Sequence, residues 1–477
     1  MRDPRARLKQ SILSLAAVAV LSGCVVGPEY MAPEMDLPDP SELALTADDL
    51  AEWDQWWSRF QDPTLDRLVE QALSGNLDIR LQLARIAESR ARLGLATAEQ
   101  LPTIDAQAEG LRQKSPAAAS PIAGASTTNN LFSIAGVLSY ELDLWGRLAR
   151  EREATEALLD QSRFGLEAVR LNVITDVASL YFALRAAERQ LQITENTLVD
   201  RAETVRIEQI RFDLGQSDEL VLRQAQAQLE FSRAAVPARR EQVRLLEGAL
   251  ALLVGLSPGE LFRELNFRGP PLESIALPED VPRGLPTDLL QRRPDIRAAE
   301  SNLMAAYARI GVAEASRLPR LSLAGVLGVA SLDEGDLFSS DAQFWSAGAS
   351  LLGPVFDFGR SRSRIETAEA LRDQVEVLYL ATVRIAFNEV RSALASYEAG
   401  IERVAAGRRQ VAVLQRTADL SMTRYDEGLV SFIEVLDARR ALLDAELSLA
   451  AAIQDHLTAA ATLFKALGGG WDQGLRG

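Results

Sequence analysis

The sequence predicts a mainly α-helical fold that also carries a membrane β-barrel and is organised as two internal repeats. Short motifs recur in the same order in the two halves of the 477-residue chain. Long segments without proline carry apolar residues at helical spacing. Four segments of about ten residues alternate between apolar and small or polar side chains, which is typical of barrel strands.

Residues 1–23 have the features of a secretory signal peptide. A basic start precedes the apolar segment 11–21, which is too short to span a membrane as a helix. The segment Leu21-Ser22-Gly23-Cys24 resembles a bacterial lipobox, so we expect diacylglyceryl and N-acyl groups on Cys24, the first residue of the mature chain. The alternative is an ordinary signal peptide followed by a chance cysteine. Cys24 is, however, the only cysteine in the chain.

The expected lipid and its sorting place the mature chain at the outer membrane. Each buried acyl CH₂ contributes about 0.8 kcal/mol, so several acyl chains anchor a protein firmly. Val25 follows the cysteine, whereas an Asp there commonly signals retention in the inner membrane in lipoprotein families. Residues 24–47 are rich in proline and acidic residues, and we expect them to form an extended arm.

An internal repeat organises the rest of the chain, with matched positions 213 to 217 residues apart. We assign the first repeat to residues 48–258 and the second to 285–470. An equatorial linker at 259–284 joins them, and residues 471–477 form a tail. The matched motifs are Asn76-Leu77-Asp78-Ile79 with Arg293-Pro294-Asp295-Ile296, Leu101-Pro102 with Leu318-Pro319, Leu142-Asp143-Leu144-Trp145-Gly146-Arg147 with Phe356-Asp357-Phe358-Gly359-Arg360, Arg211-Phe212-Asp213-Leu214-Gly215 with Arg424-Tyr425-Asp426-Glu427-Gly428, and Gly255 with Gly468.

Each repeat is predicted to run as a helix, two strands and two helices. The first helices, at about 65–100 and 286–317, end before a Leu-Pro pair. The four alternating segments predict strands at about 103–112, 131–142, 320–331 and 343–355. The alternative is a pair of hairpins packed on a soluble core, because the signal of any single barrel strand is weak.

The helices after the strands are predicted to be unusually long. Apolar residues follow helical spacing within 147–213 and a coiled-coil pattern over 383–404. A helix of about 67 residues is ~100 Å long at 1.5 Å per residue. Gly215 and Gly428 are expected to form the tip turns, from which helices return over about 217–254 and 431–467. Pro237 should kink or interrupt the first return helix.

A spanning structure built from these strands requires several chains. Beyond the signal peptide, the sequence has no run of about 18 apolar residues, so a membrane crossing would need a closed barrel. Bacterial barrels have about eight strands or more, and four cannot close. Two chains would supply eight strands and three would supply twelve; the strand count alone does not choose.

The composition argues against an enzyme and against nucleic-acid binding. A net charge of −16 repels phosphate backbones. With one His and one Cys, the chain has no internal disulfide and almost no ligands for a Cys/His metal site or a His-based triad. P-loop, GxSxG and HExxH patterns are missing from the sequence. We therefore predict no enzyme, no metal and no cofactor besides the lipid.

Several motifs in the right order resemble outer-membrane efflux proteins of the TolC-like family, in the lipoprotein subgroup often called the NodT or OprM type. The resemblance covers almost the whole mature chain. The motifs are Leu21-Ser22-Gly23-Cys24, Val26-Gly27-Pro28-Glu29-Tyr30, Trp56-Trp57 with Phe60 and Asp62-Pro63, Leu142-Asp143-Leu144-Trp145-Gly146-Arg147, Arg292-Arg293-Pro294-Asp295-Ile296, Phe356-Asp357-Phe358-Gly359-Arg360, and Val435-Leu436-Asp437-Ala438-Arg439.

This resemblance implies a homotrimer with a shared twelve-stranded barrel in outer-membrane lipid and a periplasmic helical tunnel. Its partners would be a periplasmic adaptor (membrane fusion) protein and an inner-membrane pump of the RND type. Its function would be the passive exit duct of a tripartite pump for drugs or other small toxic compounds. The nearest alternatives are an exit duct for type I protein secretion and a lipid-anchored coiled-coil scaffold that does not span the membrane. The sequence does not identify the substrate.

The resemblance also implies site residues at the periplasmic aperture. The acids that ring the aperture in the family match Glu434 and Asp437, and a tyrosine that keeps some members closed matches Tyr425. An acid on the first tip, which belongs to the closing network of the family, falls near Val221, with Asp218 and Glu219 close by but not aligned. A basic residue that some members carry after the tip glycine is Val430 here. The alternative is that these charges are merely solvated.

A second group of expected site residues marks the junctions between strands and helices. They share the repeated motif that precedes each long helix, and Trp145 could lie at the membrane interface. These residues are Asp143, Trp145, Gly146, Asp357 and Gly359.

Overall fold

The computed structural model describes residues 25–36, 55–115, 127–263, 265–278 and 289–469. The signal peptide, Cys24, residues 37–47 of the predicted arm and the tail 471–477 lie outside these residues. The chain divides into two compact units. One unit comprises residues 1–35, 85–163 and 298–380, and the other comprises 36–84, 164–297 and 381–477.

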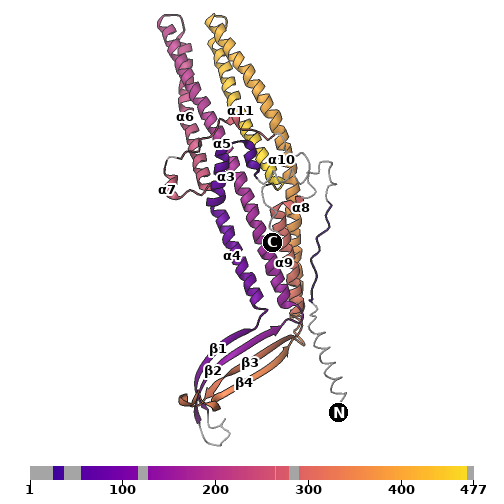
Figure 1. The fold of residues 1–477 in the computed structure, drawn as a ribbon. Helices are drawn as coiled ribbons and strands as arrows, with labels where there is room; N and C mark the ends of the chain where they lie inside the picture. Colours follow the sequence, from indigo (N-terminus) through magenta and orange to yellow (C-terminus); the bar gives the residue numbers. More distant parts are fainter. Residues whose placement is uncertain (1–24, 37–54, 116–126, 264, 279–288, 470–477) are drawn as a thin grey trace. The chain divides into compact units, whose positions relative to one another are not determined.

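Long paired helices and a single sheet make up the described residues (Figure 1). The four long helices are α5 (Arg147–Asp213), α6 (Glu219–Leu253), α10 (Arg360–Asp426) and α11 (Phe432–Ala466). Both α5 and α10 have 67 residues, and both α6 and α11 have 35, so the two repeats match in length. The remaining helices are η1 (Trp56–Phe60), α3 (Pro63–Gly75), α4 (Leu77–Ala98), α7 (Pro258–Leu261), η3 (Leu272–Ser274), α8 (Leu289–Arg292), α9 (Pro294–Ala315), η4 (Glu334–Asp336) and η5 (Ser340–Ala342).

The sheet is antiparallel, with strand order β1-β2-β3-β4. Its strands are β1 (Thr103–Ser115), β2 (Thr127–Leu142), β3 (Arg320–Ser331) and β4 (Gln343–Leu352). The two halves of the chain join where β2 pairs with β3, with Ala135 opposite Gly328. We expected the last strand to reach residue 355, but it ends at Leu352. Gly353 and Pro354 follow, and proline has no N–H for the ladder.

The first predicted helix, 65–100, is two helices separated at Asn76. This residue is extended, with φ −62° and ψ 134°. Its side-chain oxygen accepts hydrogen bonds from the backbone N–H groups of Asp78 and Ile79, which starts α4. Its amide donates to the carbonyl of Leu253 at 2.9 Å. In the second repeat Arg293 separates α8 from α9 and donates to the carbonyl of Ala466 at 3.2 Å.

Pro237 was expected to kink or interrupt the first return helix; it does not interrupt it, because α6 continues from Glu219 to Leu253. Proline removes one helical hydrogen bond, the one that residue 233 would accept. Both residues are exposed, so water can satisfy the freed carbonyl.

Buried aromatic residues form the core of the unit that contains residues 55–84. Trp56 stacks on Phe464 with ring centroids 5.5 Å apart, and Phe60 lies 4.9 Å from Phe182. The buried carboxylate of Asp62 caps α3 and accepts a 2.6 Å hydrogen bond from Tyr181.

None of the described helices has both the length and the apolar character that a membrane span requires.

Candidate functional site at the helix tips

The two tips have the same backbone geometry. Gly215 and Gly428 have φ values of 72° and 74°, a left-handed conformation that glycine adopts without steric cost. The N–H of Gln216 donates to the carbonyl of Arg211 at 2.7 Å, and that of Leu429 donates to Arg424 at 2.8 Å. Each long helix therefore ends in the same type of turn, at the position the sequence indicated.

A buried carboxylate links the two tips. Glu208 on α5 is 1% exposed and accepts three hydrogen bonds, each 3.1 Å long, from Arg211, Ser217 and Tyr425. Arg211 also donates to Asp426 at 2.7 Å, and its guanidinium lies 5.3 Å from the centre of the Tyr425 ring. Since Tyr425 and Asp426 belong to α10, this tip network ties the first hairpin to the second.

Their neighbours favour the charged form of Arg211 and the neutral form of Tyr425. The hydrogen bond to Asp426 is the main cause that raises the pKa of Arg211 above its usual value. Burial, and then the nearby Glu208 carboxylate, raises the pKa of Tyr425. The tyrosine therefore stays protonated and donates to Glu208 at neutral pH. Removing a donor would leave the Glu208 carboxylate undercompensated in a dry site.

An apolar cluster lies beside this network. Its buried members are Ala225, Phe432 and Val435, and the Phe432 ring lies 5.3 Å from that of Tyr425. Partly buried apolar side chains from all four long helices pack against it: Val205, Val221, Met422, Tyr425 and Leu436. The joint between the two hairpins of one chain therefore combines a charge network with an apolar seal.

The structure places three of the four expected aperture residues at or near the starts of the return helices, and Tyr425 at the end of α10. Asp218 caps α6 and accepts from the N–H of Leu220 at 3.0 Å. Glu434 forms a capping box with Ser431 at the start of α11. Asp437 is exposed and pairs with Arg440 at 3.3 Å. Of the four candidates, only Tyr425 joins the tip network.

Four members of the tip network were missed from the sequence: Glu208, Arg211, Ser217 and Asp426. Arg211 and Asp426 lie in the repeated Arg-Phe/Tyr-Asp motif, which was used only to align the repeats. That motif is the signal that could have identified them. Glu208 gave no signal, because one acid in a charged helix looks like a solvated residue until the partner hairpin covers it.

The strand–helix junctions are tightly built within their unit. The carboxylate of Asp143 accepts from the N–H of Ala149 at 2.8 Å, and Asp357 accepts in the same way from Ser361. Gly146 and Gly359 have φ values of 76° and 86°. The indole N–H of Trp145 donates to the carbonyl of Pro319 at 2.7 Å, so its polar atom is used inside the protein.

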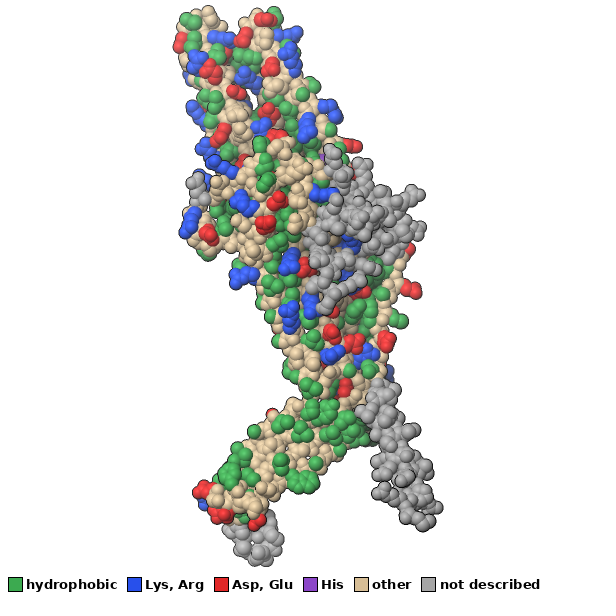
Figure 2. Space-filling view, viewed as in Figure 1, with side chains coloured by type: hydrophobic (Ala, Val, Ile, Leu, Met, Phe, Trp, Pro, Cys, Tyr) green, Lys and Arg blue, Asp and Glu red, His purple; other side chains and the backbone are tan. Residues whose placement is uncertain are grey.

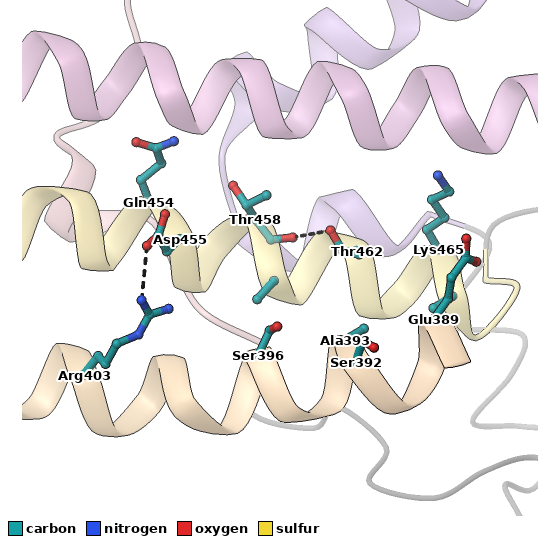
Figure 3. Close-up of a pocket in the computed structure, with 12 residues that line it drawn as sticks. Glu389, Ser392, Ala393, Ser396, Arg403, Gln454, Asp455, Thr458, Thr462 and Lys465 are labelled. Atoms are coloured by element: carbon teal, nitrogen blue, oxygen red, sulfur yellow. Dashed lines mark hydrogen bonds and ion pairs between the residues drawn. The ribbon is translucent and has the colours of Figure 1, made fainter. Parts of the chain in front are cut away.

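A shallow groove between α10 and α11 is lined by small and polar side chains (Figure 3). Arg403 and Asp455 form an ion pair at 3.3 Å at one end of the groove. On the α11 side, the hydroxyl of Thr462 donates to the backbone carbonyl of Thr458. The groove holds no nucleophile–base pair. Throughout the described residues, no group of three or more His, Cys, Asp or Glu side chains is arranged to hold a metal ion.

Comparison with known proteins decides the family. Residues 68–256 and 285–469 each match the profile of the outer membrane efflux protein family. The chain belongs to this family. The predicted family and the mainly helical, TolC-like fold with four antiparallel strands are thereby confirmed.

Members of the family resemble this chain over nearly its whole length. The solvent efflux pump outer membrane protein SrpC of Pseudomonas putida is 33% identical and covers 97% of this chain and 99% of its own length. The cation efflux system protein CusC of Escherichia coli O6:H1 is 32% identical with the same coverage. The solved OprN channel is 31% identical, with a TM-score of 0.84 over 94% of this chain and all of OprN. The CmeC channel of Campylobacter jejuni is 27% identical, with a TM-score of 0.88 over 94% of this chain and 96% of CmeC.

Family membership establishes what the protein does. It is an outer-membrane channel of an efflux pump with a helical periplasmic extension, and channels of this family are not enzymes. The predictions of an efflux channel, of an outer-membrane location and of no enzymatic activity are confirmed by this assignment. The long helices and their tips are therefore parts of a conduit.

Proposed function

We propose that three copies of this chain form the passive exit duct of a tripartite pump. The observation that carries this proposal is an incomplete sheet. Strand β4 is exposed at every residue and β1 forms the other edge, so unpaired backbone groups remain on both sides. Open edges are not tolerated in lipid, and neighbouring copies would pair them. Three copies close a twelve-stranded barrel, the size that the family resemblance implies.

The surface of the sheet supports contact with lipid. The face in view carries hydrophobic side chains, and its charged side chains gather at the far end, away from the helices (Figure 2). Large apolar side chains on and after β4 are solvent-exposed in the single chain, including Trp345 at 76% and Leu352 at 79%. Such exposure is unusual in a monomer and fits a surface that lipid or another copy covers.

The lipid on Cys24 is part of the same proposal. The N–H of Val26 donates to the carbonyl of Trp145 at 3.1 Å, and Arg150 donates to the carbonyls of Val26 and Gly27. The start of the arm is thus fixed where β2 gives way to α5. An acyl chain on the residue just before Val25 would enter the membrane near the end of the strands. Labelled palmitate should enter the wild-type chain and not Cys24→Ala.

We propose a periplasmic adaptor and an inner-membrane RND-type pump as partners. Relatives of this chain are named as efflux proteins for solvents, toluene, antibiotics and cations, which supports small toxic compounds as the substrate class. Export of proteins by a type I system is the alternative. Co-purification with a cognate RND adaptor would support the first, and co-purification with a type I adaptor would support the second.

We also propose that the expected aperture residues set the ion preference and the opening of the duct. Three copies each of Glu434 and Asp437 near a narrow opening would favour cations and oppose closure through like-charge repulsion. Asp218 and Tyr425 would border the same opening. The competing interpretation is that the acids only cap or solvate their helices.

Single-channel recording tests the duct directly. The purified lipoprotein, with its oligomer verified, is placed in a planar bilayer. We expect stable current steps, or steps that appear after deletion of residues 424–437 if the duct is closed at rest. An intact oligomer that conducts in neither form would overturn the duct and favour the non-spanning scaffold.

A further inference from the structure

The two hairpins are equivalent residue by residue at a constant offset. Helix α5 begins at 147 and α10 at 360, while α6 begins at 219 and α11 at 432, so both offsets are 213. The same offset relates their last residues, their tip glycines and the hydrogen bonds of the tip turns. A contact that one repeat makes therefore has a definable counterpart on the other.

Within the chain, repeat one uses α5 to contact repeat two. Arg211 pairs with Asp426, and Arg439 on α11 donates to Thr204 on α5 at 2.9 Å. At the offset of 213, the counterpart of the pair Arg211–Asp426 is Arg424 with Asp213. The counterpart of the pair Arg439–Thr204 is Gln226 with Thr417. These counterparts lie on α10 and on the first hairpin.

The counterpart residues are available for a partner. Arg424 is exposed and, among the described residues, its guanidinium has no hydrogen-bond or ion-pair partner. Asp213 is also exposed and accepts only an amide bond from Gln209, at 2.9 Å. Thr417 is exposed and, like Thr204, donates its hydroxyl to a carbonyl of its own helix, which leaves its lone pairs free to accept.

We propose that Arg424 of one copy forms an ion pair with Asp213 of the next copy, and that Gln226 of that next copy donates to Thr417. In a closed ring of such chains, repeat one alternates with repeat two. Each type of contact then forms once within a chain and once between neighbouring chains. This proposal rests on the homo-oligomer of the proposed function. It goes further by assigning the faces and residues that meet at the tips.

The joint between copies would be more polar than the joint within a chain. At the offset of 213, Tyr425 corresponds to Phe212, Glu208 to Ser421, Phe432 to Glu219 and Met422 to Gln209. The buried acid, its tyrosine donor and much of the apolar seal are therefore missing from the second joint. Its strength depends mainly on exposed charges, which salt screens.

Cross-linking in the assembled lipoprotein tests the pair. Arg424→Cys and Asp213→Cys are combined in one chain and treated with a short bifunctional thiol reagent, because a direct disulfide requires closer backbones than an ion pair does. We expect covalent multimers on a denaturing gel. The matched control combines Arg211→Cys with Asp426→Cys, which should cross-link inside one chain and leave it at the mass of a monomer on the gel.

Each outcome decides the proposal. Multimers from the first pair and monomers from the control would support it, and each single variant should give no ladder. An intact oligomer whose first pair gives no multimers, while the control reacts, would overturn the assigned faces and leave the duct standing. A chain that is monomeric in detergent and conducts no current would overturn both the pair and the proposed function. Because salt screens an exposed ion pair, 1 M salt should weaken the association of wild-type copies. The same salt should have a smaller effect on the variant Arg424→Gln, which has no ion pair to screen.

Discussion

The guanidinium of Arg211 donates to the carboxylate of Asp426 at 2.7 Å, across the two repeats of one chain. The same arginine holds the buried Glu208 and lies over the ring of Tyr425. One side chain thus connects a helix end, a buried charge and an aromatic ring. Disturbing it should change the tips before it changes the rest of the molecule.

Arg211→Ala should loosen the tips locally. It leaves the Glu208 carboxylate with only hydroxyl donors in a buried site, at a cost of about 1–3 kcal/mol. Hydrogen exchange of the amides around residues 205–218 should accelerate, with little change in the melting temperature. The matched control is Arg206→Ala, which removes an exposed i,i+3 pair and should leave the exchange unchanged. Equal protection in both variants would contradict the role assigned to Arg211.

The raised pKa of Tyr425 predicts that the tips respond to alkaline pH. Its pKa is raised by burial and by Glu208, so its neutral form contributes stability that is complete below the ordinary tyrosine value of about 10. That stability is lost as the pH rises through the higher folded pKa. Channel current should therefore be constant from neutral pH to about 10 and change above it.

The matched variant for this pH response is Tyr425→Phe. It has no proton to lose, so its current should not show the alkaline change. Tyr397→Phe removes another buried tyrosine hydrogen bond, to the carbonyl of Pro278, and should keep the change. An alkaline transition that persists in Tyr425→Phe would assign the titration to another group.

Glu434→Gln combined with Asp437→Asn tests the proposed aperture charges. If these acids line the opening, the variant should lose cation preference, measured as a shift in reversal potential under a salt gradient. The Gln side chain still supports the capping box with Ser431, so the start of α11 should remain intact. Glu402→Gln, an exposed acid along α10, is the control. Unchanged selectivity in the double variant would leave these acids as solvated helix residues.

Asn76→Ala should destabilise the unit that contains α3. The substitution removes the cap of α4 and the bond to the carbonyl of Leu253, and caps of this kind contribute about 0.5–2 kcal/mol. Thermal unfolding followed by circular dichroism should show a lower melting temperature. Asn388→Ala, at an exposed position inside α10, should be neutral or slightly stabilising.

The order of elements could be predicted because two periodic signals are strong in this sequence. Alternation marked the strands, and helical spacing without proline marked the long helices. The failures are local. Asn76 interrupts a helix through its own side-chain hydrogen bonds, which a pattern of apolar residues does not register. Pro237 was expected to kink or interrupt a helix, but α6 continues through it, since the loss of one hydrogen bond at an exposed position does not end a helix that packing stabilises.

The site was harder to predict than the fold. Tyr425 was named as a site residue because the family resemblance implies a tyrosine just before the tip glycine. The sequence named no acidic partner for it, and the structure shows that Tyr425 donates to Glu208, which lies before the tip glycine. Sequence spacing determines neighbours on one helix, whereas this pairing depends on how α5 packs against α10. That relationship is tertiary and has no local signature.

The equal lengths of α5 and α10, and of α6 and α11, limit which insertions and deletions the chain can accept during evolution. One residue added to α5 alone would advance its tip by about 1.5 Å and turn every later side chain by about 100°. Arg211 would then leave Asp426, and the two tips would no longer end at one level. Insertions and deletions are therefore expected to occur as matched events in both repeats, in steps close to seven residues, which restore the facing side chains. Natural relatives of different reach should differ by such paired steps.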